Sequence, residues 1–492
     1  MDLRQGKGLM GMDEMKRNMR RVFWFLFILF SLVVINLGRF LLIESPSVVT
    51  HPTNTRLKTG DRSIIRGSIY DSAGRVLAES EGQKRVYPYG NITAHVTGYN
   101  MYGKAGVEAK YNFRLESLHM EVLQRVRNII DGTPLQGNSV TLTLDAQLQT
   151  QMHDALGNRR GAVVVIEPST GKILSMVSKP DYNPENIEQT WGELSTDAER
   201  AALINRASQG LYPPGSIFKI LTAAAAYEFL PNYAEFEYEC TGLAQFGPNA
   251  IHCVNGTAHG RVDIRKAFAV SCNSFFATVG FKIGAENLRA VAERALFNTA
   301  YPYLPGLELP VEYTRSSFAL GVSNASDENS VPNSELIETA IGQGRTLATP
   351  LHMAMLTAAA ANGGIMMRPY MVDHELTDTG GIVNKSLPAK LCAPFTFEES
   401  EWLKSLMVAA VTEGTASGVS IPGVAVAAKT GTAQNGSGED HGWFVAFAPA
   451  DKPQAAVCVL LENSGGARYA QPIARQAIEY VLALGSKTDI QD

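Results

Sequence analysis

One segment of the chain reads Pro213-Pro214-Gly215-Ser216-Ile217-Phe218-Lys219-Ile220-Leu221 and is predicted to open a helix. Two prolines cannot lie inside a helix, so the helix begins after them and Ser216 falls in its first turn. Ser216 and Lys219 are three residues apart and share a helix face. The apolar run that follows predicts a buried helix, where lost hydration favours the neutral amine of Lys219. A neutral amine can take the proton of a hydroxyl, so Ser216 is a candidate nucleophile and Lys219 its candidate base.

The Ser-x-x-Lys pattern is weak by itself, because about one copy is expected by chance in a chain of this length and composition. A second copy does occur, at Ser169-Thr170-Gly171-Lys172. It falls in a turn between two predicted strands, where water would keep the lysine charged, and we assign it no role. For Ser216 taken alone, a helix-capping serine with a surface lysine explains the pattern as well as catalysis does.

A second motif, Ser271-Cys272-Asn273, lies on a predicted short connection between helices. Its hydroxyl and its carboxamide can therefore point into one cleft, where the hydroxyl can relay a proton and the amide can hold a substrate amide. Taken alone, the motif is better explained by a capping serine followed by a loop asparagine.

A third motif, Lys429-Thr430-Gly431-Thr432, ends a predicted strand that begins at Val424. A lysine and two hydroxyls at a strand edge suit a carboxylate, and Gly431 lets a ligand backbone lie against the strand. A similar triplet, Lys58-Thr59-Gly60, has no strand context and receives little weight.

Strands are predicted near both ends of the region that contains these motifs. They cover residues 161–166, 172–177, 424–433, 442–448 and 454–462. The chain between them is Ala-rich and mostly helical, over 216–230, 262–283, 285–295, 350–361 and 398–413, and a helix over 468–484 follows. Strands at both ends with helices between them predict an α+β domain with one antiparallel sheet flanked by helices.

The N-terminal region carries an apolar run. Charge is absent from residues 22–38, and the run resumes after Arg39 and continues to Ile43. A helix over 22–43 would span about 33 Å, enough for the hydrocarbon core of a bilayer. Basic residues precede the run, and the positive-inside rule then places the N-terminus in the cytoplasm and the rest of the chain outside. A cleaved signal peptide is the alternative, but bulky residues rather than small ones follow the run.

These patterns divide the chain into six parts. We expect a cytoplasmic tail over 1–21, a transmembrane anchor over 22–43, a linker over 44–62, a pedestal domain over 63–150, the main domain over 151–485 and a tail over 486–492. The pedestal is predicted to be a small α+β domain with a hairpin around residues 71–74, a helix over 115–130 and a strand over 140–144.

The composition excludes several classes of protein. The chain has 492 residues, of which 45% are hydrophobic and 18% charged, too apolar for a disordered protein. Lys and Arg number 43 against 48 for Asp and Glu, and the net charge of −5 disfavours a nucleic-acid partner. Five scattered cysteines are too few for a disulfide scaffold.

The three motifs in this order are far more specific than any one of them. The set resembles that of the serine acyl-transferases that include penicillin-binding proteins and serine β-lactamases. The likeness is to class B penicillin-binding proteins, and among them to a short member of the penicillin-binding protein A type, over nearly the whole chain to about residue 484. Further segments that carry it are 66–78, 106–108, 142–145, 161–178, 212–216, 259–260, 341–344, 349–350 and 441–444. The pedestal is shorter than in many members of the class. A partner contact that a longer pedestal makes in those members is therefore not expected of this chain.

The resemblance implies a catalytic role for four residues. Ser216 would form an acyl-enzyme with the penultimate D-Ala of a stem peptide, and Lys219 would act as the base for this step. Ser271 would relay a proton to the leaving group, and Lys429 would sustain the field around Ser271.

The resemblance also implies the residues that bind the substrate. Asn273 would bind the peptide amide of the donor. Thr430, Gly431 and Thr432 would hold its terminal carboxylate or the equivalent group of a β-lactam. The backbone N–H groups of Ser216 and Thr432 would form the oxyanion hole. No cofactor and no metal are expected.

The implied function is that of a membrane-anchored peptidoglycan D,D-transpeptidase that β-lactams inhibit covalently. Its implied partners are donor and acceptor stem peptides, β-lactams, membrane lipid and a polytopic glycan-strand polymerase. A D,D-carboxypeptidase or a β-lactamase would share the acylation step, but the anchor, the pedestal and the lack of a recognisable deacylating glutamate disfavour them. A β-lactam sensor or assembly scaffold is disfavoured because the region before the anchor is short and every motif residue is present.

A cysteine pair lies between the first two motifs. Cys240 and Cys253, with His259 nearby, are explained equally by a zinc site or by a disulfide outside the cell. The resemblance favours a disulfide between Cys240 and Cys253 over free thiols and over zinc.

Overall fold

The computed structural model describes residues 6–39, 64–82, 84–116, 135–299, 309–320, 334–436 and 438–488. The chain forms two units, residues 1–61 and residues 62–492. The first contains helix α1 (Gly6–Arg39), within which the 21 residues Arg17–Leu37 have a mean hydropathy of 1.9 and none is buried. A helix of this length spans about 32 Å, so the predicted N-terminal helix is long enough and apolar enough to cross a bilayer. Residues 40–43 of the predicted anchor and residues 44–62 of the linker lie outside the described residues.

The centre of the second unit is a five-stranded antiparallel sheet in the order β17-β18-β19-β7-β8. Its strands are β7 (Gly161–Ile166), β8 (Ile173–Lys179), β17 (Ala427–Ala433), β18 (His441–Ala448) and β19 (Ala455–Leu461). Val459 of β19 pairs with Val163 of β7, so the two ends of the main domain meet in the sheet. Every residue of β7 and β19 is buried, because other elements cover both faces of these strands.

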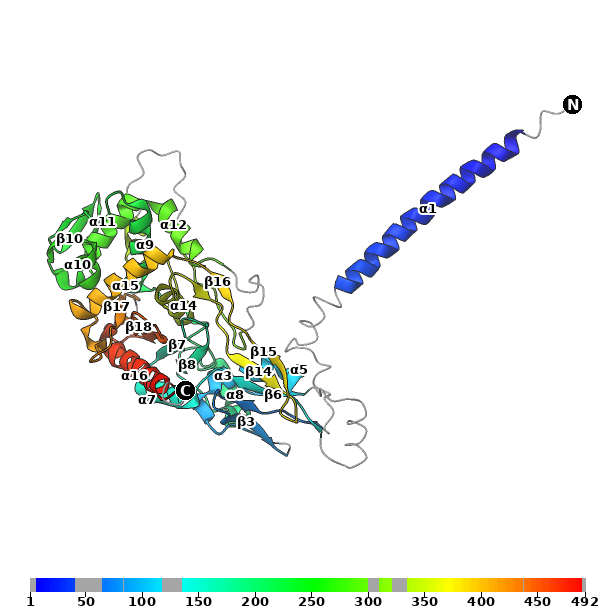
Figure 1. Cartoon of the computed structure of the whole chain (residues 1–492), viewed down its shortest axis with the longest axis horizontal. Coiled ribbons are helices and arrows are strands. Elements are labelled where there is room, and N and C mark those ends of the chain that lie inside the picture. The colour runs from blue at the N-terminus through cyan, green and yellow to red at the C-terminus, as the bar shows by residue number, and fades with distance from the viewer. Residues whose placement is uncertain are drawn as a thin grey trace. The chain divides into compact units, whose positions relative to one another are not determined.

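The main helices of this domain are α9 (Lys219–Phe229), α10 (Ile264–Ala269), α11 (Asn273–Ile283), α12 (Ala285–Arg294), α14 (Pro350–Ala361), α15 (Phe397–Thr412) and α16 (Ala470–Thr488). Helices α14 and α16 pack on β19, and α9 packs against α11, α12 and α15 (Figure 1). The predicted α+β class with a sheet flanked by helices is confirmed. The predicted helical region over 262–283 is divided in two, because residues 270–272 leave the helical path.

The pedestal contains a six-stranded sheet in the order β15-β14-β6-β2-β3-β4. Its strands are β2 (Ile69–Tyr70), β3 (Val76–Glu81), β4 (Lys84–Val86), β6 (Ser139–Leu142), β14 (Val372–Leu376) and β15 (Ile382–Lys385). The hairpin around residues 71–74 and the strand near 140–144 are present as predicted, whereas β14 and β15 come from late in the chain and were not predicted. Most of the predicted helix over 115–130 lies outside the described residues.

Shorter elements complete the second unit. The short helices are α3 (Ala94–Thr97), α4 (Gly106–Lys110), α5 (Asn112–Leu115), α7 (Ala146–Leu156), α8 (Ile187–Thr196) and α13 (Ser334–Ala340). Four two-stranded pairs join β1 (Ile64–Ile65) with β5 (Leu135–Gln136), β9 (Tyr238–Cys240) with β12 (Gly260–Val262), β10 (Leu243–Phe246) with β11 (Asn249–His252), and β13 (Met366–Met367) with β16 (Lys390–Cys392).

The pedestal buries one carboxylate between two guanidinium groups. Arg66 Nε donates to Glu108 Oε2 at 2.6 Å, and Arg85 Nε donates to Glu108 Oε1 at 2.7 Å. Burial by itself raises the pKa of Glu108, but the charges and hydrogen bonds of Arg66 and Arg85 outweigh it and bring this pKa below its ordinary value. The carboxylate therefore stays ionised and joins residues that are far apart in sequence.

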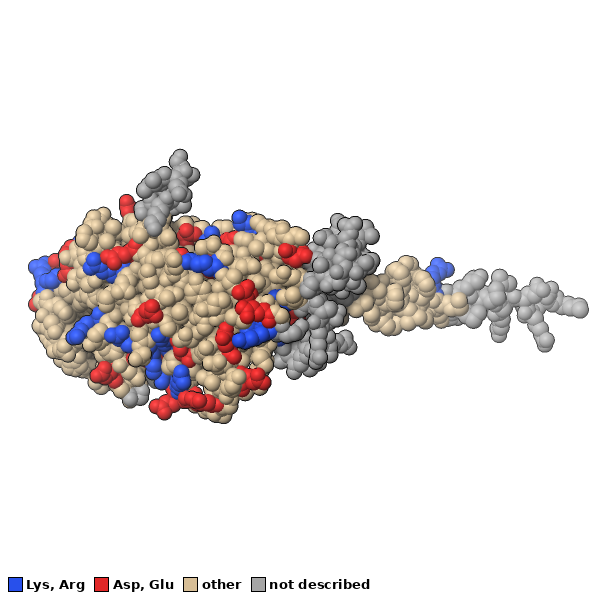
Figure 2. Space-filling view, turned by 90° about the horizontal axis from the view of Figure 1, so that it is seen from below, with Lys and Arg blue, Asp and Glu red and all other residues tan. Residues whose placement is uncertain are grey.

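Charged side chains of both signs are interspersed on the face of the molecule seen in Figure 2. Among the described residues on this face, Lys and Arg do not merge into a continuous basic surface of the kind that follows a nucleic-acid backbone.

Candidate active site

Ser216 lies in the 3₁₀ turn Gly215–Phe218, which leads directly into helix α9. The predicted helix start is therefore confirmed, with a tighter first turn than an α-helix has. Two hydrogen bonds fix the approach to this turn: the indole N–H of Trp443 donates to the carbonyl of Pro213 at 2.8 Å, and the turn's first N–H donates to the carbonyl of Gly342 at 2.8 Å. The position of Ser216 is thus set by strand β18 and by the loop that follows α13.

Two glycines let this turn approach strand β17 closely. Gly215 has a φ of 56°, and a Cβ at this position would lie 2.4 Å from the carbonyl oxygen of Thr432. A Cβ on Gly431 would lie 3.0 Å from Cγ2 and 3.3 Å from the backbone nitrogen of Ile217. The backbones of the Ser216 turn and of β17 are consequently in direct contact.

Two buried lysine amines converge on one serine. Lys219 Nζ donates to the Ser271 carbonyl at 2.8 Å and to Asn273 Oδ1 at 2.8 Å, and lies 3.3 Å from Ser271 Oγ. Lys429 Nζ donates to Ser271 Oγ at 2.9 Å and to the Thr430 carbonyl at 3.1 Å. Both lysine side chains are fully buried. The Ser271 hydroxyl therefore lies between the two amines, where it can pass a proton from one to the other.

Burial changes the protonation of these amines. Loss of hydration lowers the pKa of Lys219 to about 7. Loss of hydration also brings the pKa of Lys429 well below its ordinary value, and the nearby charge of Lys219 lowers it further. None of the described contacts of either amine is with a carboxylate; each amine lies instead over an aromatic ring, that of Phe276 for Lys219 and that of Phe268 for Lys429. A neutral amine that can accept a proton is therefore available near neutral pH.

The segment Ser271-Cys272-Asn273 is held in a strained conformation. Ser271 has a φ of 57°, which costs on the order of 1–3 kcal/mol for a residue with a side chain. Cys272 caps helix α11, because its sulfur accepts from the N–H of Phe275 at 3.4 Å. The Asn273 amide donates to the carbonyl of His252 at 2.9 Å. The segment is thereby tied to α11 on one side and to the β10–β11 hairpin on the other.

A cavity of about 750 Å³ opens above these residues. The predicted site residues among those that line it are Ser216, Ser271, Asn273, Thr430 and Thr432. Lys219 and Lys429 lie behind its wall and reach it through Ser271, whereas Gly431 faces Ile217 and Trp443. The structure thus brings together all eight predicted site residues around one cavity.

Several residues of the cavity wall were not assigned a role from the sequence. They include His252, Gln343, Thr415, Asp440 and Arg468. Thr415 Oγ1 lies 2.7 Å from Thr430 Oγ1, and Gln343 Nε2 donates to the carbonyl of Thr432 at 3.2 Å. Thr415 follows α15 in a loop without a recognisable motif, so no local signal could have indicated it.

The predicted disulfide between Cys240 and Cys253 is not formed in the structure described here. Cys240 and Cys253 are both free, and their sulfur atoms are 3.7 Å apart, against about 2.05 Å for a disulfide bond. The Cys253 sulfur is equally close to that of Cys272, at 3.7 Å. It therefore lies between two sulfurs rather than being committed to Cys240.

A serine at the start of a buried helix, two desolvated lysines and a polar strand edge around one cavity define the class of active-site serine acyltransferases. Residues 161–479 match the penicillin binding protein transpeptidase domain, and residues 66–140 match the penicillin binding protein A dimerisation domain. The chain belongs to the penicillin-binding protein transpeptidase family.

Known relatives resemble the chain along nearly its whole length. The peptidoglycan D,D-transpeptidase PbpA of Mycobacterium tuberculosis is 32% identical over 505 residues, which cover 95% of this chain and 99% of the relative. PbpA of Mycolicibacterium smegmatis is 31% identical over 519 residues, covering 96% of this chain and 100% of the relative. The structure of penicillin-binding protein A from M. tuberculosis as an imipenem acyl-enzyme complex superposes with a TM-score of 0.77 at 31% identity, covering 86% of this chain and 99% of that chain.

Proposed function

We propose that this protein is a membrane-anchored peptidoglycan D,D-transpeptidase that crosslinks stem peptides through a serine acyl-enzyme and is inhibited covalently by β-lactams. The observation that carries the proposal is the contact chain Lys219–Ser271–Lys429, buried behind a cavity that Ser216 lines. Relatives of nearly the same length are D,D-transpeptidases by name, and a solved relative was trapped as a β-lactam acyl-enzyme.

In the acylation step, Ser216 Oγ forms a bond to the carbonyl carbon of the penultimate D-Ala. The hydroxyl proton passes to the neutral amine of Lys219, whose lowered pKa suits this transfer near neutral pH. Negative charge develops on the carbonyl oxygen, and the backbone N–H groups of Ser216 and Thr432 stabilise it. The close approach of the Ser216 turn to strand β17 supports this pairing of donors from two different elements.

The tetrahedral intermediate then breaks the C–N bond to the terminal D-Ala. The leaving amine takes a proton through the hydroxyl of Ser271, which the buried amines of Lys219 and Lys429 replenish. The amine of an acceptor stem peptide next attacks the acyl carbon and gives up a proton. A new amide bond forms, the ester bond breaks, and Ser216 recovers its hydroxyl proton.

Substrate binding falls to the strand edge and to Asn273. Thr430 and Thr432 present hydroxyls to the cavity and bind the carboxylate of the donor or of a β-lactam. Gly431 leaves no side chain between this edge and the Ser216 turn. Asn273 faces the donor amide while its own amide also holds Lys219 and the His252 carbonyl.

The anchor sets where the reaction takes place. Helix α1 crosses the membrane once, with Arg17, Arg20 and Arg21 on the cytoplasmic side and the catalytic domain outside the cell. In this arrangement residues 1–21 form the cytoplasmic tail, 63–150 the pedestal and 151–485 the transpeptidase domain. A polytopic glycan-strand polymerase, as in the class, supplies the strands that are crosslinked.

The assignment is tested with a fluorescent penicillin and the full chain in detergent micelles. The wild-type protein is expected to be labelled covalently, and Ser216→Ala is expected to abolish labelling. Ser169→Ala is the matched control, because it alters the other Ser-x-x-Lys pattern at an exposed position, and it is expected to label normally. Labelling of the Ser216→Ala protein would refute the proposed nucleophile.

A further inference from the structure

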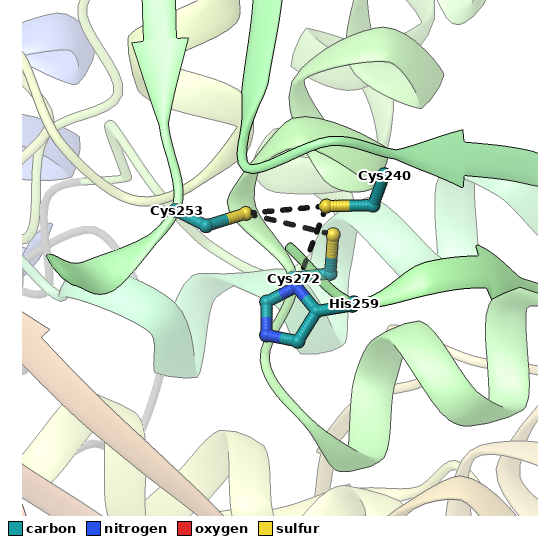
Figure 3. Close-up of side chains that lie close together, drawn as sticks. All are labelled: Cys240, Cys253, His259 and Cys272. Atoms are coloured by element: carbon teal, nitrogen blue, oxygen red, sulfur yellow. Dashed lines mark hydrogen bonds between the residues drawn. The ribbon is translucent and has the colours of Figure 1, made fainter. Parts of the chain in front are cut away.

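Four side chains with metal-binding atoms converge next to the active-site cavity (Figure 3). They are Cys240, Cys253, His259 and Cys272, and their ligand atoms all lie within 4.8 Å of one another. The three cysteines are buried, and His259 is partly exposed at the cavity wall. The sequence pattern had suggested only the first three of them, because Cys272 is separated from the others by helix α10.

The spacing of these atoms fits a tetrahedron around a metal ion. The sulfurs of Cys240 and Cys253 are 3.7 Å apart, those of Cys253 and Cys272 are 3.7 Å apart, and the Cys240 sulfur is 3.4 Å from His259 Nδ1. Four ligands in a tetrahedron at ordinary zinc–sulfur and zinc–nitrogen bond lengths give sulfur–sulfur edges of about 3.8 Å and sulfur–nitrogen edges of about 3.6 Å.

We propose that Cys240, Cys253, His259 and Cys272 bind one zinc ion, which fastens the Ser271-Cys272-Asn273 segment to the neighbouring hairpins. Three thiolates and one imidazole are a closed ligand set of the kind found in structural zinc sites, and soft thiolate ligands favour zinc over magnesium or calcium. A single disulfide would leave the third buried thiol and the imidazole unused, whereas zinc engages all four groups.

The surrounding fold gives the ion a structural purpose. Cys240 ends β9, Cys253 follows β11, His259 precedes β12 and Cys272 caps α11. The strands β9 to β12 form only two-stranded pairs, which are marginally stable in water without further support. One ion at the junction of these four elements closes this part of the fold.

Neighbouring groups support thiolate ligands. The Phe275 N–H points at the Cys272 sulfur, and Ser274 Oγ lies 3.3 Å from the Cys253 sulfur. Donors of this kind stabilise negative charge on sulfur and fix the orientation of the ligand. Residues 240 and 260 are paired across β9 and β12, which also places His259 beside Cys240.

The site adjoins catalytic residues, and this part of the inference rests on the proposed function. Cys272 lies between Ser271 and Asn273, and Asn273 is bonded to His252, next to Cys253. A zinc ion on these cysteines would hold the strained Ser271 in place. We therefore expect loss of zinc to slow acylation about tenfold or more. Losing an interaction that orients a functional side chain commonly reduces activity by this amount.

The first test measures zinc and thiols in the full-length protein purified in detergent without added metal. Elemental analysis is expected to find about one zinc per chain, and denaturation with a chelator but no reductant is expected to release all five thiols. Five thiols without zinc would overturn the proposal in favour of free thiols. Three thiols would overturn it in favour of a disulfide.

Variants locate the ion within the protein. Cys240→Ser is expected to abolish zinc retention, whereas Cys392→Ser, which alters a cysteine outside the cluster, should keep it. Retention of zinc by Cys240→Ser would overturn the assigned ligand set. If Cys240→Ser does not fold, cobalt is substituted into the wild-type protein to report on the ligands. Thiolate-to-cobalt charge-transfer bands and the visible bands of a tetrahedral site are expected. Their absence would refute the site.

The last test asks whether the ion supports the active site. The rate of labelling by fluorescent penicillin is measured before and after removal of zinc by a chelator, and again after zinc is restored. A reversible loss supports the link to Ser271. An unchanged rate would refute that link while the metal content still identifies the site, and a zinc-loaded protein that never labels would refute the proposed function instead.

Discussion

In the pedestal, Arg66 and Arg85 are buried against Glu108, whereas in the transpeptidase domain Lys219 and Lys429 are buried without a carboxylate among their described contacts. The shared carboxylate of Glu108 offsets the lost hydration of the two guanidinium groups. The lysines have no such partner, so burial lowers their pKa values instead. Removing the anion from a buried ion pair leaves an uncompensated charge, whereas a buried amine without an anion partner can act as a base.

The two Ser-x-x-Lys patterns differ in the same way. Lys219 is fully buried, while Lys172 is about one third exposed and lies 3.7 Å from Asp373. Ser169 is exposed in the turn before β8. The same residue spacing therefore buries one amine away from any described carboxylate and leaves the other partly exposed beside a carboxylate.

The largest expected effect comes from removing the base. Lys219→Met should slow acylation by penicillin about 10²–10⁴-fold, the usual contribution of a general base. Lys172→Met is the control and should acylate at the wild-type rate, since its amine takes no part in the reaction. Stopped-flow or gel-based labelling measures the acylation rate of each variant. A Lys219→Met protein that acylates as fast as the control would refute the role of Lys219 as the base.

The next effect concerns stability rather than chemistry. Glu108→Gln should lower the free energy of unfolding by about 3–5 kcal/mol, because it leaves Arg85 buried without its anion and Arg66 with only the partly exposed Glu116. Chemical denaturation followed by tryptophan fluorescence measures the change. The folded fraction should still acylate normally.

Glu237→Gln provides the matched control for Glu108. Its partner Arg261 is 74% exposed, so loss of this ion pair should leave stability unchanged within error. Equal losses of stability in the two variants would show that the buried Glu108 ion pairs contribute no more than an exposed ion pair.

The Lys219→Met protein should be no less stable than the wild type, since it removes a buried polar group that pairs with no anion.

The smallest effect is a pH dependence. The amine of Lys219 accepts a proton only when neutral, so the acylation rate should fall about tenfold per pH unit below its pKa of about 7 and level off above it. A pH profile of the labelling rate at saturating penicillin measures this. A profile that stays flat through the neutral range would contradict a base with a pKa lowered by burial.

Local sequence was enough to place most elements of the transpeptidase domain. Strand β7 and helix α14 have the predicted bounds, because an apolar run between turn residues and a proline at a helix start are strong local signals. The pedestal strands β14 and β15 were missed, because β14 pairs with β6, more than 200 positions away in the chain, and β15 joins the sheet only through β14. Nothing in the sequence indicated that Cys272 lies beside Cys240 and Cys253, because it reaches them only through the packing of α10 and α11.

The residues alone determined the order of the three motifs, the start of the helix at Ser216 and the apolar N-terminal helix, because backbone preferences and hydrophobic periodicity act over short distances along the chain. Only the tertiary structure decided that two amines meet at Ser271, that both amines are buried away from water, and that three sulfurs and an imidazole lie close together. Protonation and metal affinity depend on what surrounds a group in space, and those surroundings come from segments that the chain brings together only when it folds.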